Sequence, residues 1–243
     1  DLVIVLEEIS IYKVNEAIGT LLSSILCKIG YKELHQKNKY KGYSFSPLEM
    51  LNLREKHNYS SGSMHSFYFR TLDAELIRTL VKELNKDSFT NKAFTVLGAT
   101  IAKPKIISNN AKTFTFNTLS PAVIVSKIKE EKQRSIKTEN ISREILFDAI
   151  NNNLRNKVKQ FYSIELSPTD WIIDITMNSR NNFFYQYKGT KAIKPLHIYG
   201  TSLELVLKKN SPKELLSVIF ANGIGEKNSC LGAGYVSLEK SWM

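Results

Sequence analysis

The sequence predicts an α+β fold made of two tandem ferredoxin-like domains, each with the element order β-α-β-β-α-β. In four segments, apolar residues recur at helical spacing, and short apolar or alternating runs typical of strands lie between them. This order of elements restarts about halfway along the 243 residues, although the two halves share no visible sequence repeat. We place the boundary after residue 117, with an N-terminal domain over 1–117 and a C-terminal domain over 118–243.

The first helix is the clearest element of the first half. Apolar residues lie three and four apart over 16–29, with Asn15 as a plausible N-cap and Gly30 just beyond the end. The segment 73–85 has the same amphipathic spacing and predicts a second helix. The strands expected around these helices lie at 2–6, 43–47, 66–70, 94–107 and 113–118.

The second half repeats this order with a longer first helix. Residues 127–139 are densely charged and predict a solvated loop. Ser211, Pro212 and Glu214 have the spacing of a capping box at the start of a short helix. The other elements expected here are strands at 119–128, 170–177, 182–187, 196–207 and 234–238, and a helix at 142–161.

Charge and composition point to a polyanionic partner. Lys and Arg total 34 against 23 Asp and Glu, a net charge of +11, and 42% of the residues are hydrophobic, enough for a real core. The 2 cysteines exclude a disulfide framework and suit a reducing cytoplasm. The four histidines have no metal-ligand spacing, and the apolar run 2–6 is too short to span a membrane. We therefore expect a cytoplasmic protein with no metal, cofactor or membrane contact.

The most distinctive stretch is 223–234, G-I-G-E-K-N-S-C-L-G-A-G. Glycines let backbone N–H groups approach a phosphate, and a lysine supplies charge. The spacing fits neither a dinucleotide fingerprint nor a Walker loop. A plain glycine hairpin before the last strand is the structural alternative. The residues predicted to bind RNA here are Gly223, Gly225, Lys227, Asn228, Ser229, Gly232 and Gly234.

Three features resemble those of one known family. They are the glycine-rich tail, the run Thr118-Leu119-Ser120-Pro121 before an apolar strand, and His35 followed six residues on by Lys41 and then by Tyr43. In these features the chain resembles the CRISPR precursor-RNA processing endoribonucleases, part of a superfamily of repeat-associated RNA-binding proteins with ferredoxin-like folds. Some members have a tyrosine in the first helix, where this chain has Leu22 at about the same position. The resemblance implies that the protein makes guide RNAs from repeat transcripts.

The resemblance also implies roles for particular residues. The family has its catalytic histidine at the end of the first helix, which matches His35. Cleavage by the RNA's own 2′-OH needs a base, an acid for the leaving 5′-oxygen and a cation for the developing charge. We expect His35 to be the general acid/base, Lys41 the electrostatic stabiliser and Tyr43 a third catalytic group. The products would be a 2′,3′-cyclic phosphate and a 5′-hydroxyl, without a metal. Tyr31 and Tyr40 are alternatives for the third role, and His57 is the alternative base.

Further basic residues predict RNA contacts outside the glycine-rich stretch, since lysine and arginine neutralise phosphates. They are Lys28, Lys37, Lys39, Arg180, Lys188, Lys191 and Lys194. The expected partner is CRISPR repeat RNA, with subunits of a CRISPR effector complex and a second copy of the chain as further candidates. Two other functions stay open. One is a non-catalytic RNA-binding subunit of such a complex, and the other is a general RNA-binding module, for which the usual aromatic motifs are missing.

Overall fold

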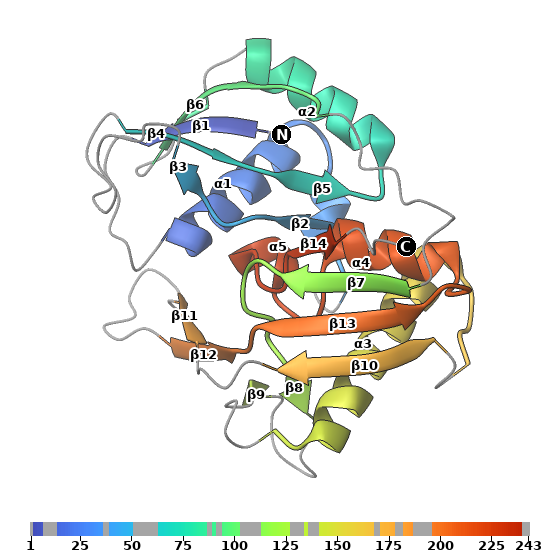
Figure 1. Cartoon of the computed structure of the whole chain (residues 1–243). Helices are drawn as coiled ribbons and strands as arrows, with labels where there is room; N and C mark the ends of the chain where they lie inside the picture. The colour runs from blue at the N-terminus through green and yellow to red at the C-terminus, as the bar shows by residue number, and fades with distance from the viewer. Residues whose placement is uncertain are drawn as a thin grey trace.

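The structure is a computed structural model. It describes residues 2–6, 14–35, 39–50, 63–86, 89–90, 94–102, 113–126, 134–135, 141–167, 171–177, 182–186 and 196–239. Two halves lie one above the other in Figure 1, and each is built around one four-stranded sheet. The last segments of the chain, coloured red, lie at the junction between the halves (Figure 1).

The first half is a four-stranded antiparallel sheet with two helices. The strand order is β3-β4-β1-β6, so the first strand of the chain lies inside the sheet. Asp73 caps the second helix, because its carboxylate accepts from the backbone N–H groups of Glu75 and Leu76 at 2.9 and 3.0 Å. The elements are β1 (Leu2–Leu6), α1 (Val14–Lys28), β3 (Glu49–Met50), β4 (Ser63–Phe67), α2 (Ala74–Lys86) and β6 (Phe94–Ala99).

The second half has the same architecture. Its antiparallel sheet has the order β10-β13-β7-β14. Ser142 caps the long helix by accepting from the backbone N–H of Ile145. The elements are β7 (Thr113–Thr118), α3 (Arg143–Tyr162), β10 (Ile172–Met177), β13 (Leu203–Lys208), α4 (Lys213–Asn222) and β14 (Val236–Glu239).

Each half therefore has the ferredoxin-like topology that the sequence predicts. When the four strands of a half are counted in chain order, both sheets run second, third, first, fourth. The strand at 113–118 was expected to close the first half, but as β7 it pairs with β13 and β14 of the second sheet. Its Phe114 and Phe116 side chains are buried in the core of the second half, which explains this pairing. The boundary between the sheets thus lies between β6 and β7, one strand earlier than predicted.

Several short elements complete the two halves. β2 pairs with β5, β8 with β9, and β11 with β12. The short elements are η2, a 3-10 helix (Lys32–His35), β2 (Tyr43–Phe45), β5 (Phe69–Thr71), β8 (Val125–Ser126), β9 (Arg134–Ser135), β11 (Asn182–Gln186), β12 (Leu196–Gly200) and α5 (Asn228–Leu231).

Three local predictions for the second half are corrected by the structure. Of the strand expected at 119–128, the described part, up to 126, contains only β8, preceded by isolated bridges at Ala122 and Val123. The strand expected at 196–207 divides into β12 and β13, because Thr201, between them, forms an isolated bridge with Ala122. The capping box does not form, since α4 begins at Lys213 without a side-chain cap.

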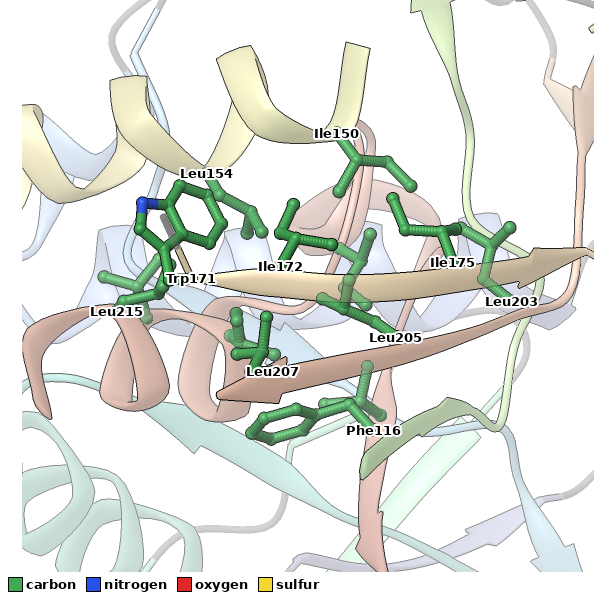
Figure 2. Packing of buried hydrophobic residues seen from close by; sticks show 14 of the residues in the cluster. Phe116, Ile150, Leu154, Trp171, Ile172, Ile175, Leu203, Leu205, Leu207 and Leu215 are labelled. Carbon is green, nitrogen blue, oxygen red and sulfur yellow. The ribbon is translucent and has the colours of Figure 1, made fainter. Parts of the chain in front are cut away.

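The core of the second half lies between α3, α4 and the sheet. Figure 2 shows Ile150 and Leu154 of α3 pointing toward Ile172 and Ile175 of β10. Residues 146, 150, 154 and 158 of α3 are all buried, as the predicted apolar spacing requires. The core of the first half is formed in the same way by α1, α2 and the facing strands.

The two halves are fastened together by side chains of β2 and β5. The Ser44 hydroxyl donates to the Ala221 carbonyl at 2.9 Å. The Arg70 guanidinium donates to the Val236 carbonyl at 2.6 Å and lies over the rings of Phe220 and Tyr235, 3.9 and 4.3 Å from their centroids. Burial lowers the pKa of Arg70. The halves are thus joined by specific polar and cation–π contacts.

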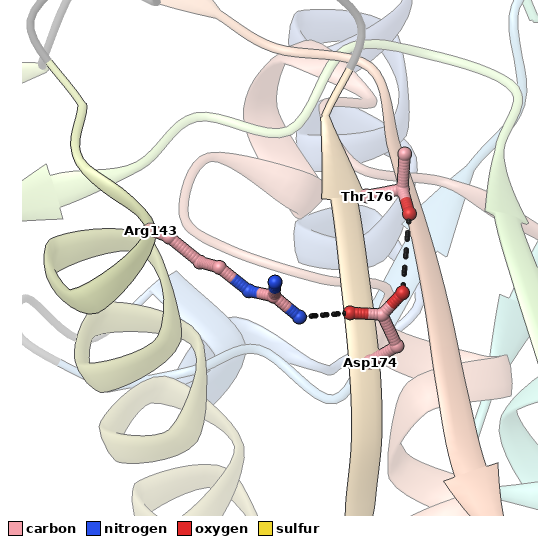
Figure 3. Close-up of polar contacts among 3 residues, drawn as sticks. All are labelled: Arg143, Asp174 and Thr176. Atoms are coloured by element: carbon pink, nitrogen blue, oxygen red, sulfur yellow. Dashed lines mark hydrogen bonds and ion pairs between the residues drawn. The ribbon is translucent and has the colours of Figure 1, made fainter.

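A separate polar contact ties the start of α3 to β10. Arg143 Nη2 lies 2.5 Å from Asp174 Oδ1, and Thr176 donates to the same carboxylate (Figure 3). The Arg143 side chain is 74% exposed. An ion pair this exposed is worth only about 0–1 kcal/mol, so we treat it as a surface contact.

Candidate RNA-binding junction

The glycine-rich stretch 223–234 occupies the junction between the halves, and we call it the glycine-rich loop. It leaves α4, forms the single turn α5 and enters β14 (Figure 1). The turn α5 packs against α1 and β2 of the first half. The loop is therefore enclosed by the first half on one side and by α3 and α4 on the other.

Most of the loop is buried, and its glycines serve close packing. A Cβ on Gly234, where φ is +64°, would collide with the Ile224 carbonyl oxygen. A Cβ on Gly232 would lie 2.6 Å from the ring of Phe45 in β2. The glycines that were predicted to contact RNA, including Gly223 and Gly225, are buried against the protein's own backbone. These glycines thus have a packing role that the sequence did not predict, and their contact with RNA stays a prediction.

Polar side chains hold the loop from inside. The Asn228 amide donates to the carbonyls of Ile224 and Ala233 at 3.0 and 2.6 Å. Ser120 donates to the Gly232 carbonyl and accepts from the backbone N–H of Tyr235. Asn228, predicted to bind RNA, thus uses its side chain to close the loop.

Lys157 of α3 is the cation at the centre of the loop. Its side chain is fully buried, and Nζ donates to the carbonyls of Gly223 and Gly225 at 2.8 and 2.9 Å and to Asn228 Oδ1 at 3.0 Å. Burial lowers the pKa of Lys157 to about 7, against the opposing effect of Glu226. Lysine is almost never fully buried unless it is paired, so these three acceptors explain how Lys157 can be buried here.

A hydrogen-bond network then joins the loop to the segment that follows His35. The Tyr40 hydroxyl donates to Glu226 Oε1 at 3.2 Å, and the Asn153 amide donates to the same oxygen at 2.8 Å. Burial and the Glu226 charge raise the pKa of Tyr40, which keeps its hydroxyl protonated as a donor. The backbone of Tyr40 also exchanges two hydrogen bonds with the Gln160 side chain, at 3.0 and 2.6 Å.

Two predicted cations meet at this junction from different halves. Lys227 is exposed at the tip of the glycine-rich loop, and Lys41 lies half-buried just before β2. Burial raises the pKa of the Cys230 thiol, and the charges of Lys227 and Lys41 both act to lower it. The charge of Glu16 acts on the same thiol in the opposite direction. The two lysine-bearing segments are joined by a hydrogen bond, because Tyr40, next to Lys41, donates to Glu226, next to Lys227. Lys227 has a φ of 64°, an uncommon conformation for a residue with a side chain.

Tyr43 is in a different setting from the one predicted. Its side chain is fully buried, 5.2 Å from the ring of Phe69 between centroids. Burial raises the pKa of its phenol, beside the hydroxyls of Ser23 and Ser229. A phenol enclosed in the core has no access to an RNA strand in this conformation. This burial argues against a catalytic role for Tyr43, and Ser229 contributes to the surroundings of its phenol.

Other predicted residues are placed only in part. His35 ends the 3-10 helix that follows α1, and its side chain lies outside the described residues. Lys39 is exposed, and exposed Lys28 lies over the Phe89 ring at 4.5 Å from the centroid. The half-buried side chain of Tyr31 packs against the core of the first half. Residues that lie outside the described part are Lys37, His57, Arg180, Lys188, Lys191 and Lys194.

Sequence reasoning missed the residues that hold the loop in place. Lys157 has the spacing of a core position, seven residues after Ile150 and three after Leu154. A lysine on the apolar face of a helix is a detectable signal for a buried cation. The roles of Asn153, Gln160 and Glu226 had no such signal, because each depends on a contact far away in sequence.

Within the described residues, no three His, Cys, Asp or Glu side chains form a group that could hold a metal ion. The described helices include none that is both long and apolar enough to cross a bilayer.

Fold and junction together define a class: two tandem ferredoxin-like domains with a glycine-rich loop packed between them. Residues 101–238 match the family model described as CRISPR associated protein Cas6, C-terminal, which is more than half of the chain. The chain belongs to the Cas6 family of CRISPR-associated proteins.

Solved structures with the same fold extend the match over the whole chain. One, described as a RAMP protein binding different RNA substrates, has a TM-score of 0.67 and 18% identity, covering 98% of each chain. A second, described as CRISPR associated protein Cas6, has a TM-score of 0.66 and 19% identity over 97% of this chain and 98% of the other. A Cas6-related protein from Pyrococcus furiosus has a TM-score of 0.61 and 19% identity, covering 99% of each. No curated protein matches the sequence significantly.

Proposed function

We propose that this protein is a metal-independent endoribonuclease that cleaves CRISPR repeat transcripts to make guide RNAs. The observation that carries the proposal is the 3.2 Å hydrogen bond from the Tyr40 hydroxyl to Glu226. It joins the residue before Lys41, which lies six residues after His35, to the residue before Lys227 of the glycine-rich loop. Two ammonium groups from different halves provide a place for an RNA phosphate at the junction. Membership of the Cas6 family and the net charge of +11 support the same substrate class.

The proposed reaction uses the RNA's own nucleophile. His35 acts as general acid/base: the 2′-oxygen loses its proton and forms a bond to the adjacent phosphorus. The bond from phosphorus to the 5′-oxygen breaks, and that oxygen gains a proton and leaves as a hydroxyl. Lys41 stabilises the charge that develops on the phosphate oxygens. The products are a 2′,3′-cyclic phosphate and a 5′-hydroxyl, with no metal and no other reactant consumed.

RNA binding is assigned to the exposed cations around the junction. Lys227 and Lys39 are exposed and belong to the loop and to the segment before Lys41. Lys28 is exposed at the end of α1, which leads toward His35. Contacts by the predicted cations outside the described residues stay predictions. The same is true of a homodimer and of binding to effector subunits.

Cleavage in the absence of divalent metal tests the proposal. End-labelled CRISPR repeat RNA from the source genome is incubated with the protein in EDTA, beside His35→Ala, Lys41→Ala and the surface control Lys86→Ala. We expect one cut by the parent and by Lys86→Ala. We expect a loss of about 10²–10⁴ in rate for His35→Ala without loss of RNA affinity. Lys41→Ala should lower the rate more than Lys86→Ala, because only Lys41 lies at the junction.

Each other outcome has a definite meaning. Cutting that survives His35→Ala moves the base to another residue, and His57, Tyr31 and Tyr40 are the next to test. Tight and specific RNA binding without any cutting by the parent contradicts the nuclease and favours the non-catalytic RNA-binding subunit.

A further inference from the structure

One stripe of α3, buried at Asn153 and Lys157 and exposed at Gln160, contacts both segments that carry the junction cations. Asn153, Lys157 and Gln160 are spaced four and three residues apart, so they lie along one face of the helix. Lys157 and Asn153 contact the glycine-rich loop, and Gln160 and Asn153 contact Tyr40. None of these three residues is given a role in the proposed reaction.

Lys157 fixes the loop on both sides of Lys227. Its Nζ donates to Gly223 and Gly225, which precede Lys227, and to Asn228, which follows it. The three acceptors are neutral oxygens of one loop. Their arrangement around a single amino group leaves the backbone at Lys227 little freedom. This agrees with the φ of 64° that Lys227 adopts there.

Asn153 and Gln160 hold the segment that carries the other cation, Lys41, through contacts with its neighbour Tyr40. Gln160 holds the backbone of Tyr40, the residue next to Lys41, by two hydrogen bonds. Asn153 donates to Glu226 and to the Tyr40 hydroxyl, and accepts from the backbone N–H of Gly225. The Tyr40 ring lies 5.4 Å from Lys157 Nζ. The loop and the segment before β2 are thus fastened to the same surface of α3.

We propose that the stripe Asn153–Lys157–Gln160 of α3 is a positioning platform that sets the spacing of Lys41 and Lys227 for binding RNA phosphates. Lys157 and Gln160 act as positioning residues, because their side chains hold the segments that bear the cations. This inference rests on the RNA-binding part of the proposed function and does not depend on cleavage.

A merely structural role for Lys157 makes a different prediction. In that case Lys157→Met would weaken RNA binding only as much as any other core change with the same loss of stability. The matched control is Leu146→Ala, a buried truncation near the start of α3, seven residues before Asn153 of the stripe. For exposed Gln160 the control is Asn152→Ala, which is exposed on the same helix.

The test measures affinity for a labelled CRISPR repeat RNA at a temperature where every variant is folded. We expect Lys157→Met to weaken binding about tenfold and Leu146→Ala to leave it nearly unchanged. Lys227→Ala should weaken binding in the parent but add little to Lys157→Met, since residues that act as a unit are not additive. Gln160→Ala and Lys41→Ala should be coupled in the same way, and Asn152→Ala should have no effect.

Hydrogen exchange gives a readout that needs no RNA. Lys157→Met should speed amide exchange within 221–235 and leave α2 unchanged. The inference is overturned if Lys157→Met and Gln160→Ala both bind RNA like the parent, or if their effects add to those of the cation variants. A parent that binds but does not cut contradicts the nuclease and leaves the platform supported by its binding data. A parent that does not bind repeat RNA overturns both proposals.

Discussion

Gly19 in the middle of α1 lies directly against the carbonyl oxygen of Cys230 in α5. A Cβ at residue 19 would collide with that oxygen and with the Cys230 backbone behind it. Glycine inside a helix is unfavourable by roughly 1 kcal/mol relative to alanine, so its presence here has a packing reason. This contact lets the glycine-rich loop approach the helix that leads to His35.

The first prediction concerns this contact. Gly19→Ala should lower the free energy of unfolding by at least about 2 kcal/mol, although alanine is the better helix former, because the colliding atoms are backbone and cannot rotate away. Denaturant unfolding measures the change. Ser24→Ala, an exposed change in the same helix, is the control and should be nearly neutral. Equal stability of Gly19→Ala and the parent would mean that α5 can withdraw from α1.

The second prediction concerns the pH dependence of stability through Lys157. Its pKa is lowered by burial from the ordinary 10.5 to about 7, so between these values the unfolded chain binds more protons at this site than the folded one. The contribution of Lys157 to the free energy of unfolding should therefore rise with pH from about 7 to about 10, while the raised pKa values of Cys230 and the buried tyrosines act in the opposite direction at the upper end.

Lys157→Met removes this dependence while keeping a side chain of similar length. The charged groups near Lys157 are Glu226 and, if it ionises, Tyr40, and both remain in the variant. The gap in stability between parent and variant should widen as pH rises through this window. A gap that stays constant from pH 7 to pH 10, within the error of chemical denaturation, would contradict the lowered pKa.

The third prediction separates charge from backbone at Lys227. Lys227→Ala should weaken RNA binding and reduce the slope of log K against log salt by about 1, because one phosphate contact is lost. Stability should change by less than about 0.5 kcal/mol, because the side chain is exposed. Lys227→Gly should bind RNA as weakly but be more stable, since glycine accepts the left-handed conformation. An unchanged salt slope would remove Lys227 from the RNA contacts.

The fourth prediction follows from the position of Tyr43. Tyr43→Phe should leave the cleavage rate within about threefold of the parent, far less than the loss expected for a general acid or base. The phenol is buried in the core, so its removal affects packing and not RNA. Single-turnover cleavage at saturating protein measures this rate. A loss of about 10²-fold or more would return Tyr43 to the reacting groups and require the core to open.

The sequence predicted the fold and identified the glycine-rich loop, because both depend on local patterns, but it did not predict that the loop lies between the two halves. Helical spacing identified α1, α2 and α3 to within a few residues, and the glycine spacing identified the loop. It could not assign β7 to its sheet, since Phe114 and Phe116 alternate in the same way whichever core they enter. Pairing is decided by contacts with β13 and β14, more than 80 residues away in the chain.

The candidate site was predicted in part. Lys41 and Lys227 were selected from the sequence, and the structure joins their neighbours Tyr40 and Glu226 by a hydrogen bond, while the roles of both lysines stay predictions. Tyr43 was selected because it follows His35 and Lys41 in the run that resembles the family, but the three residues of β2 are all buried, and the resemblance did not indicate this. Lys157 has the apolar-face spacing of a core residue, and only the fold reveals its three acceptors.

The central claim is that the protein cuts RNA through the RNA's own 2′-OH. The most direct measurement uses repeat RNA with a single 2′-deoxy substitution at the mapped cut, in EDTA, with end-group analysis of the products from unmodified RNA. The account predicts that the deoxy RNA binds like the parent RNA and stays intact, while unmodified RNA yields a 2′,3′-cyclic phosphate and a 5′-hydroxyl. Cutting of the deoxy RNA at the same position, or cutting that requires added divalent metal, would contradict it.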